Sequence, residues 1–347
     1  MNGPGYLKRH VTRVLRDALA VSRVVFLNGA RQAGKTTLAL RVAEDLDASF
    51  VSLDDRAARE LARDDPEELL DREGPLVIDE VQRGGNDLLL AIKANVDRDT
   101  RPGRFLLTGS TRFLTVPHLS ESLAGRVDLV DLWPLSQGEI QGREERFLDS
   151  LFGSTRTLRR RRPTPITRRE AFERVCGGGF PESVSRTARQ RERWLAAYVR
   201  TLTERDVGEV ANIQRVPDLA ALVHLLAART ASPVNVSNLA NEADIPRTTL
   251  HGYLPLLETV YLIFRVPAWS RNITSKRVKQ AKVHFTDSGL AAHVLGATPA
   301  SLSRPDTRVA GPLLESFVAS ELARQATWSN LAVTMHHFRD RAGAEVD

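Results

Sequence analysis

The segment that most constrains the fold of this chain is residues 28–37, with the sequence NGARQAGKTT. An apolar run, residues 24–27, precedes it, and a helix-like run, residues 38–43, follows it. A G-x-x-x-x-G-K-[ST] pattern between a strand and a helix predicts a phosphate-binding loop. Gly29 and Gly34 let backbone N–H groups converge on an anion, and the helix adds its positive dipole end. The alternative is a glycine turn before an ordinary helix, which this context disfavours.

The same loop predicts which residues hold a nucleotide. Lys35 can reach the outer phosphates, and the Thr36 hydroxyl can ligate Mg²⁺. Lys35 is therefore also a catalytic candidate, and Thr36 is a candidate metal ligand. The predicted nucleotide-binding set is Gly29, Ala30, Arg31, Gln32, Ala33, Gly34, Lys35, Thr36 and Thr37.

Two acids follow the apolar run of residues 75–78 and form the second decisive pattern. Asp79, at the tip of this predicted strand, can hold Mg²⁺ through its water shell, and Glu80 can polarise the water that attacks the γ-phosphate. A strand that ends in solvated acids is the alternative, but the upstream loop favours the catalytic interpretation. Asp54 and Asp55 end another predicted strand. They either face the magnesium site or, as we favour, one of them caps the following helix.

Two further strands are predicted over residues 104–110 and 127–132. Thr108 and Ser110 at the end of the first can hydrogen-bond the γ-phosphate or the lytic water, or they can simply satisfy a turn. Arg126 stands at the mouth of the second. A guanidinium there could stabilise phosphate charge in the transition state, in cis or from a neighbouring subunit. An ordinary surface arginine is an equally open interpretation.

Composition limits the classes of protein to which the chain can belong. It has 347 residues, so two or three domains are expected, and a hydrophobic content of 42% excludes wholesale disorder. No apolar stretch is long enough to span a bilayer, and no secretory signal is evident. Cys176 is the only cysteine, which suits a reducing cytoplasm, the predicted location. The net charge of +6 is compatible with a nucleic-acid partner without indicating one.

The second half of the chain differs from the first half in composition. Residues 156–169 hold four consecutive arginines and two prolines, and they predict an exposed linker; such runs can bind phosphate backbone but are usually solvated. Helices, a tight turn and a two-stranded wing then form the pattern of a winged helix. The predicted helices are residues 218–229, 236–243 and 247–259, and the predicted strands are residues 261–266 and 281–285.

The helix after the tight turn carries Arg247 and Thr248, which can touch phosphates or base edges. The predicted wing, residues 271–282, is basic and contains no acid, so it is a candidate strip for phosphate contacts. Its basic residues are Arg271, Lys276, Arg277, Lys279 and Lys282. The candidate nucleic-acid set is Arg247, Thr248, Lys276, Arg277 and Lys279. Because one face of the helix is apolar, a protein-docking or structural module is the alternative.

Together these stretches resemble a family of bacterial and archaeal ATP-binding proteins, which join an AAA-type ATPase domain to a C-terminal domain of unknown function. The resemblance follows the family's order along nearly the whole chain. The arginine-rich insert, residues 152–167, departs from the family pattern and leaves the domain boundary open. The matching stretches are residues 29–38, 52–55, 78–82, 107–110, 122–126, 134–136, 178–182, 203–207 and 285–290, and Glu315 paired with residues 345–347.

The resemblance implies a sheet in which the strand ending at Thr108 lies between the strands that carry Lys35 and Asp79. That order would place Thr108 and Ser110 beside the γ-phosphate. The resemblance also implies that Arg126 is the candidate arginine finger, and an oligomer could form if it acts on a neighbouring subunit.

The C-terminal part resembles the PD-(D/E)xK nuclease fold, with Glu315 on a helix and Asp347 on a strand. Nuclease catalysis there would need a further Glu-x-Lys strand to complete a metal site. The sequence stops at Asp347, in what looks like the start of another strand. We therefore expect the chain to continue, and we assign no metal-dependent cleavage.

The predicted fold class is α/β. An AAA-like P-loop NTPase, with a parallel sheet between two layers of helices, precedes an α-rich winged-helix module and a partial α/β C-terminal domain. The predicted domains are the ATPase domain, an arginine-rich linker, the helical and winged-helix module and the incomplete C-terminal part. Their bounds are residues 1–140, 141–170, 171–290 and 291–347.

The predicted function is that of a Mg²⁺-dependent ATPase that uses ATP hydrolysis to move the winged-helix module and its partner. That partner is double-stranded DNA or a protein, and no membrane is involved. ATP is favoured over GTP because no Asn-Lys-x-Asp motif occurs. A nucleotide-gated DNA-binding regulator and a small-molecule kinase are the alternatives. Glu80 beside Asp79 favours water over a metabolite as the phosphate acceptor.

Overall fold

The chain divides into two compact units, Met1–Trp133 and Pro134–Asp347. The predicted first boundary, after residue 140, therefore falls inside the second unit; the other predicted boundaries stay predictions. The described helices include none with the length and apolar character needed to cross a bilayer. The computed structural model describes residues 6–110, 123, 125–153, 165–206, 216–270, 280–340 and 344–346.

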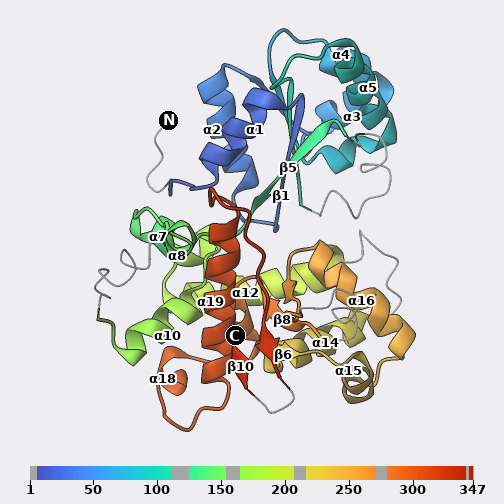
Figure 1. The fold of residues 1–347 in the computed structure, drawn as a ribbon. Coiled ribbons are helices and arrows are strands. Elements are labelled where there is room, and N and C mark those ends of the chain that lie inside the picture. The colour runs from blue at the N-terminus through green and yellow to red at the C-terminus, as the bar shows by residue number, and fades with distance from the viewer. Residues whose placement is uncertain are drawn as a thin grey trace. The chain divides into compact units, whose positions relative to one another are not determined.

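Within the described part of the first unit, five strands form a parallel sheet in the order β2-β3-β4-β1-β5 (Figure 1). The sheet confirms the predicted α/β fold class, and β4 lies between β1 and β3 as the family resemblance implied. The strands are β1 (Val24–Gly29), β2 (Ser49–Ser52), β3 (Leu76–Asp79), β4 (Phe105–Gly109) and β5 (Val127–Leu132).

Helices cover both faces of this sheet (Figure 1). The helices α1 and α2 lie on one face, and α3, α4 and α5 lie on the other. A short 3₁₀ helix, η1, joins β3 to α5. The helical segments are α1 (Thr12–Val21), α2 (Lys35–Leu46), α3 (Arg56–Asp64), α4 (Pro66–Leu70), η1 (Val81–Gly84) and α5 (Gly85–Arg98).

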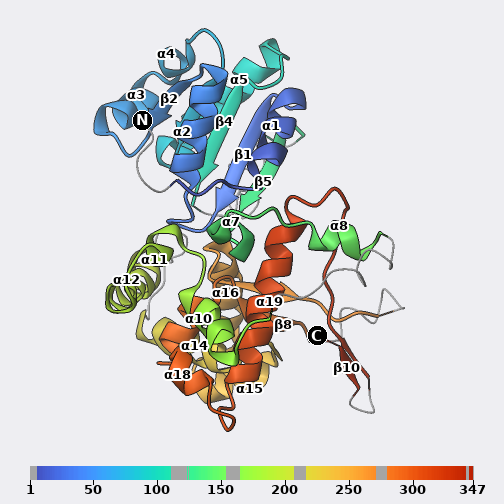
Figure 2. The ribbon, with the colours of Figure 1, turned by 90° about the vertical axis from the view of Figure 1, so that its left-hand side faces the viewer.

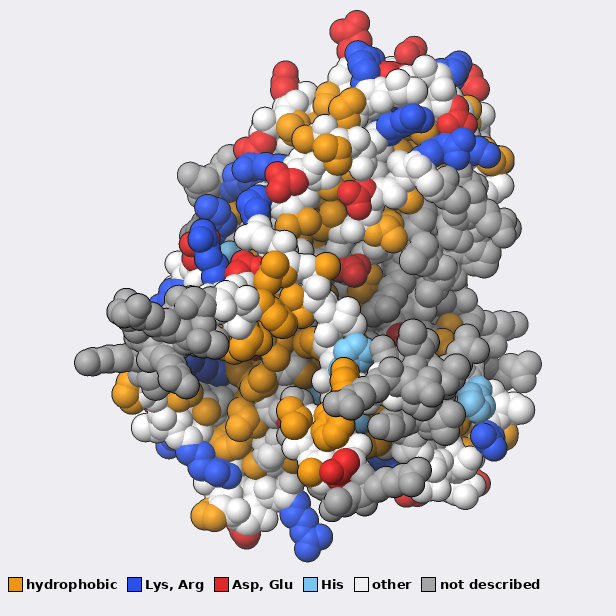
Figure 3. All heavy atoms as spheres, viewed as in Figure 1, with side chains coloured by type: hydrophobic (Ala, Val, Ile, Leu, Met, Phe, Trp, Pro, Cys, Tyr) orange, Lys and Arg blue, Asp and Glu red, His pale blue; other side chains and the backbone are white. Residues whose placement is uncertain are grey.

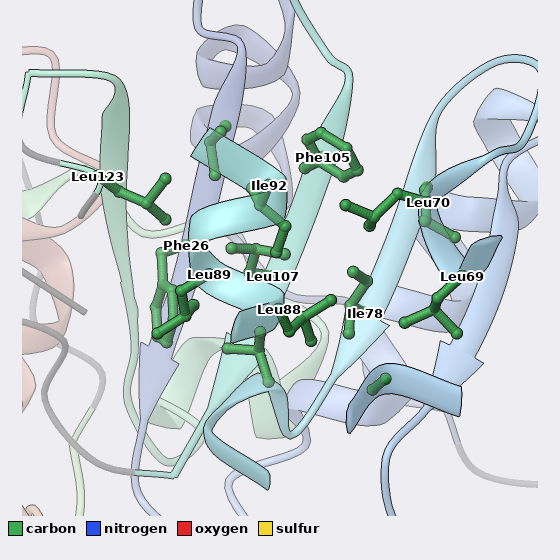
Figure 4. Packing of buried hydrophobic residues seen from close by; sticks show 14 of the residues in the cluster. Phe26, Leu69, Leu70, Ile78, Leu88, Leu89, Ile92, Phe105, Leu107 and Leu123 are labelled. Carbon is green, nitrogen blue, oxygen red and sulfur yellow. The ribbon is translucent and has the colours of Figure 1, made fainter. Parts of the chain in front are cut away.

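The residues of β1 alternate between two hydrophobic cores. Phe26 joins the core under α3–α5 (Figure 4), whereas Val25 and Leu27 join the core under α1 and α2. Successive side chains of a strand point to opposite faces, so a strand covered on both sides reads as a continuous apolar run. Each fully buried side chain of this size contributes roughly 1.5–3 kcal/mol relative to exposure. This pattern explains why the strands could be predicted from the sequence.

Asp54 and Asp55 have separate structural roles at the end of β2. The Asp55 side chain accepts a hydrogen bond from the Ala58 N–H at 3.0 Å and caps α3, which confirms the favoured interpretation. Asp54 forms an ion pair with Arg83 at 3.1 Å.

The second unit is mostly helical, and its long helix α19 contacts α10, α17 and β8 (Figure 2). Its helical segments are α7 (Gln137–Gln141), α8 (Phe147–Leu151), α10 (Arg168–Gly177), α11 (Pro181–Val184), α12 (Ala188–Thr201), the π-helical turn η3 (Leu202–Asp206), α14 (Val216–Ala228), α15 (Val236–Ala243), α16 (Arg247–Thr259), α17 (Ser288–Val294), α18 (Pro299–Leu302) and α19 (Ala310–Ala326).

Small antiparallel sheets complete the second unit. In the described residues, β6 (Ser232–Pro233), β7 (Ile263–Val266) and β8 (Lys282–Phe285) form one sheet in the order β6-β8-β7. Along the chain, α14, β6, α15, α16, β7 and β8 follow one another. The strands β9 (Phe338–Arg339) and β10 (Glu345–Val346) pair separately.

The helix α19 also has an apolar outer side. Leu314 and Val318 are exposed, and apolar side chains gather over this helix on the face seen in Figure 3. Glu315 lies between these two residues on the helix, as predicted.

A glycine turn between α10 and α11 anchors the start of the second unit. The Gly179 N–H donates to Asp287 Oδ2 at 2.6 Å, and the Gly179 carbonyl accepts from the Leu135 N–H at 2.7 Å. A Cβ atom at Gly179 would lie 2.1 Å from the Leu135 carbonyl oxygen. Only glycine allows the two backbones to approach this closely.

We predict that Gly179→Ala lowers the free energy of unfolding by about 1–3 kcal/mol, because the new methyl group must displace backbone atoms. Gly177→Ala is the matched control. A Cβ atom at Gly177 would meet no atom within 4 Å. Alanine in a helix is more stable than glycine by roughly 0.5–1 kcal/mol. Urea unfolding of both variants measures the difference. Equal stability of the two variants would contradict the tight approach at Gly179.

Candidate functional site

The glycine-rich loop leaves the end of β1 and returns into α2, which begins at Lys35. A Cβ atom at Gly29 would lie 2.3 Å from the Leu132 carbonyl oxygen, so no larger residue fits beside β5. Gly34 has φ = 97°, a left-handed conformation that favours glycine. Gln32 also has positive φ, at 60°. Both glycines of the pattern are therefore required by the backbone path of the loop.

The ammonium group of Lys35 is held by the loop itself. The side chain is buried, and Nζ donates to the carbonyl oxygens of Gly29 and Ala30, at 3.0 Å each. Phosphate oxygens are charged acceptors and form stronger hydrogen bonds than carbonyl oxygens do. A bound phosphate could thus compete with these two carbonyl oxygens for the ammonium group.

The Asp79 carboxylate is the centre of a hydrogen-bond network at the end of β3. Thr108 Oγ1 donates to Asp79 Oδ1 at 2.6 Å, and Thr36 Oγ1 lies 3.1 and 3.0 Å from the two carboxylate oxygens. Ser52 Oγ approaches Oδ2 at 3.4 Å. Asp79 is 2% exposed. Asp79, Thr108 and Thr36 were predicted as site residues from the sequence, whereas Ser52 was not.

Glu80 follows directly and has an unusual backbone conformation, with φ = 55°. Its N–H donates to Thr108 Oγ1 at 3.2 Å, and its carboxylate Oε2 accepts from Ser110 Oγ at 3.4 Å and from the Gln82 amide. Left-handed conformations of residues other than glycine are strained and cluster at functional sites. The hydrogen bonds of Glu80 bring it together with Thr108 and Ser110, as predicted for the end of β4.

Gln82 is a site residue that the sequence reasoning missed. Its Nε2 contacts both Glu80 and Ser110, and its Oε1 is buried without a hydrogen-bond partner among the described residues. A buried unpaired acceptor is costly unless a ligand group or water donates to it. The turn of η1 after β3 brings the side chain back toward Glu80, and the position of Gln82 within the matched motif was the only signal in the sequence.

Arg126 does not join this site within the same chain. It precedes β5, whose first residue Val127 pairs with Val24 at the start of β1, whereas the loop follows the far end of β1. Six strand residues span about 20 Å. Arg126 instead pairs with Asp97, Nε to Oδ1 at 2.5 Å, and this hydrogen bond lowers the pKa of Asp97 and raises that of Arg126. The predicted role in cis is therefore wrong; a role in trans stays a prediction.

The candidate nucleic-acid residues lie in the second unit. Arg247 and Thr248 are exposed at the start of α16. Lys276, Arg277 and Lys279 lie outside the described residues. Lys282 was predicted to extend the basic strip, but it is 2% exposed, and its Nζ lies 2.8 Å from Glu315 and 2.7 Å from Glu345. Burial against two carboxylates removes Lys282 from the predicted basic strip.

Comparisons with known proteins place this chain in a family. An AAA domain matches residues 21–141, and a domain of unknown function, DUF8612, matches residues 168–301. Uncharacterised proteins of Mycobacterium tuberculosis and Mycobacterium bovis are each 30% identical over 345 residues, covering 98% of this chain and 70% of theirs. The chain belongs to the AAA-type P-loop ATPases with a C-terminal domain of unknown function.

The fold of this AAA-type protein is also similar to a solved structure, the Walker-type ATPase of Pyrococcus abyssi. The TM-score is 0.50 at 16% identity, and the match covers 85% of this chain and 99% of that one. Similarity at this level supports the fold of the AAA-type chain, whereas the roles of its site residues rest on their own geometry.

We predict that Thr108→Val destabilises this AAA-type protein by about 1–3 kcal/mol, because it removes the shortest hydrogen bond to the buried Asp79 carboxylate and the acceptor of the Glu80 N–H. Thr100→Val, at an exposed position, is the matched control, with an expected change within about 0.5 kcal/mol. Denaturant unfolding followed by circular dichroism gives both values. A Thr108→Val protein as stable as the control would argue against the network around Asp79.

Proposed function

We propose that the chain binds ATP at residues 29–37 and hydrolyses it in a Mg²⁺-dependent reaction. The observation that carries this proposal is the convergence of Thr36 and Thr108 on the Asp79 carboxylate, next to the loop that holds Lys35. The amides of the loop and the first turn of α2 would bind the phosphates, because helix N-termini favour anions. Lys35 would exchange its carbonyl acceptors for phosphate oxygens.

The donor atoms at this point suit Mg²⁺, which prefers oxygen ligands and is usually held by one or two carboxylates together with substrate phosphates. The Thr36 hydroxyl and the Asp79 carboxylate are such donors, and they lie 3.0 Å apart at their closest. In this proposal Thr36 and Asp79 hold the ion. Bound Mg²⁺ would neutralise charge on the β- and γ-phosphates.

Glu80 is the residue that we propose to accept a proton from the attacking water. The contacts from Ser110 and Gln82 both fall on Oε2, so Oε1 is the oxygen proposed to meet the water. The unpaired Gln82 Oε1 lies in the same cluster and supports a donating group, such as water, at this point. Ser110 and Gln82 would orient the Glu80 carboxylate rather than react themselves.

We predict that Glu80→Gln retains ATP binding but lowers kcat by roughly 10²–10⁴-fold, since it removes one positioned base. Lys35→Ala weakens ATP binding by roughly 10- to 150-fold, the value of a hydrogen bond to a charged group. Phosphate release and nucleotide titration measure the two effects, and chelation of Mg²⁺ with EDTA should stop turnover in the native protein.

Glu60→Gln is the matched control for Glu80→Gln, because Glu60 is exposed on α3 and pairs with Arg56. It should hydrolyse ATP at the native rate. Full turnover by Lys35→Ala would end the proposal. ATP consumption without matching phosphate release would favour a small-molecule kinase instead.

A second proposed function concerns the module formed by α14, β6, α15, α16, β7 and β8. Two observations support a winged helix here, the order of these elements and the sheet order β6-β8-β7. Arg247 and Thr248 are exposed at the start of α16, where they could meet a phosphate backbone. We propose that the module contacts double-stranded DNA. Either ATP hydrolysis moves the module together with the bound DNA, or the bound nucleotide regulates whether the module binds DNA. A protein partner is the alternative.

We predict salt-sensitive binding to duplex DNA that is lost when Lys276, Arg277 and Lys279 are changed to glutamine. Each lost phosphate contact should reduce the slope of log K against log salt by roughly 0.9. Fluorescence anisotropy at several salt concentrations measures this slope.

The control for the DNA experiment changes three exposed arginines of the first unit to glutamine and removes the same charge. These are Arg56, Arg63 and Arg101. Equal loss of binding in the two triple variants would indicate a nonspecific charge effect, and no binding at low salt would favour the protein partner.

A further inference from the structure

Arg9 is a buried arginine that the sequence reasoning did not include in the site. It precedes α1 in the first unit and is 6% exposed. Its Nη1 donates to the Ala33 carbonyl at 2.8 Å, and its Nη2 donates to the Trp133 carbonyl at 2.5 Å. One guanidinium group therefore contacts both the phosphate-binding loop and the last residue of the first unit.

The hydrogen bond from Arg9 to the Ala33 carbonyl affects the direction in which the next amide of the loop, the Gly34 N–H, points. A peptide bond is planar and trans, so the Ala33 C=O and the Gly34 N–H of the same peptide unit point in opposite directions. By holding the carbonyl, Arg9 also fixes the direction of the Gly34 N–H, which would donate to the anion in the proposed complex. Gly34 has φ = 97° and no side chain, so a hydrogen bond to the preceding peptide can hold a conformation that glycine alone adopts readily.

The contact with Trp133 connects the loop to the point where the chain leaves the first unit. Leu132, at the end of β5, is the residue whose carbonyl lies against Gly29, and Trp133 follows it. The next backbone amide, that of Leu135 in the second unit, donates to Gly179. Pro134 is thus the one residue between a backbone anchor of the first unit and a backbone anchor of the second.

Arginine is suited to this place and lysine is not. The guanidinium is planar and presents several N–H donors in a fixed fork, so it can bridge two carbonyl groups at once, whereas an ammonium group is a compact point charge. Movement of the Ala33 peptide upon phosphate binding would therefore change the position of the guanidinium and, through it, the Trp133 carbonyl.

We propose that Arg9 is a positioning residue that orients the phosphate-binding loop and transmits its response to nucleotide to Trp133, where the first unit ends. This inference rests on the proposed ATP binding. It assigns Arg9 no contact with the reacting atoms, and it predicts effects on nucleotide affinity and on the backbone near Trp133.

The test compares the native protein with Arg9→Lys and Arg9→Gln, and Arg16→Lys is the matched control because Arg16 is exposed and pairs with Asp45. Hydrogen–deuterium exchange is measured with and without a non-hydrolysable ATP analogue and Mg²⁺. In the native protein and in Arg16→Lys, the nucleotide should slow exchange in the loop and in residues 130–136. In both Arg9 variants the response at residues 130–136 should be lost.

Steady-state kinetics provide the second measurement. Arg9→Lys should raise the KM for ATP roughly tenfold or more, because the loop amides are no longer oriented before ATP binds. The change in kcat should be smaller. The exchange of buried β1 and β4 amides without nucleotide reports whether each variant is folded.

The outcomes are distinguishable from a failure of the ATPase proposal. A native protein that binds no nucleotide would end the proposed function itself. A native protein that binds the analogue without any change at residues 130–136 would overturn the role of Arg9, whatever the variants do. Folded Arg9 variants that keep the native response and the native KM would overturn it as well.

Discussion

The buried carboxylate of Asp79 is the group on which the nucleotide site depends. Burying a carboxylate is costly unless hydrogen bonds compensate it, and here Thr108 and Thr36 provide them at 2.6 Å and 3.0 Å. The two donors come from β4 and α2, so one carboxylate joins three segments at a single edge of the sheet. The proposed function assigns a role to each residue, to Thr36 as a ligand of Mg²⁺ and to Asp79 as its partner, so the interaction that supports the fold also underlies the proposed chemistry.

The parallel sheet explains why these groups meet at all. Parallel strands end at a common edge, and ligands of open α/β sheets bind outside the carboxyl ends of the strands. Because β4 lies between β1 and β3, Thr108 near its carboxyl end lies between the loop after β1 and the two acids at the end of β3. The same rule places Arg126 away from the site of its own chain, since it precedes its strand rather than following it.

An ATPase site within the first unit affects the second unit only if some structural element carries the change. Arg9 is the element that the contacts favour, because it binds the loop at Ala33 and the exit of the unit at Trp133. In the second unit, the Leu135 N–H donates to the Gly179 carbonyl in the turn between α10 and α11.

The sequence by itself determined the strand–loop–helix around Lys35, the acids at Asp79 and Glu80, and the helices on both sides of the sheet. Local physics decides these features: glycine conformations, apolar periodicity, and charge at the ends of strands. Tertiary structure alone decided that Arg9 contacts the loop at Ala33, that Gln82 contacts Glu80, that Arg126 lies at the opposite end of its strand from the loop, and that Lys282 is buried between two glutamates. Those outcomes depend on strand register and on contacts between residues far apart in the chain, and no local pattern of residues encodes such distances.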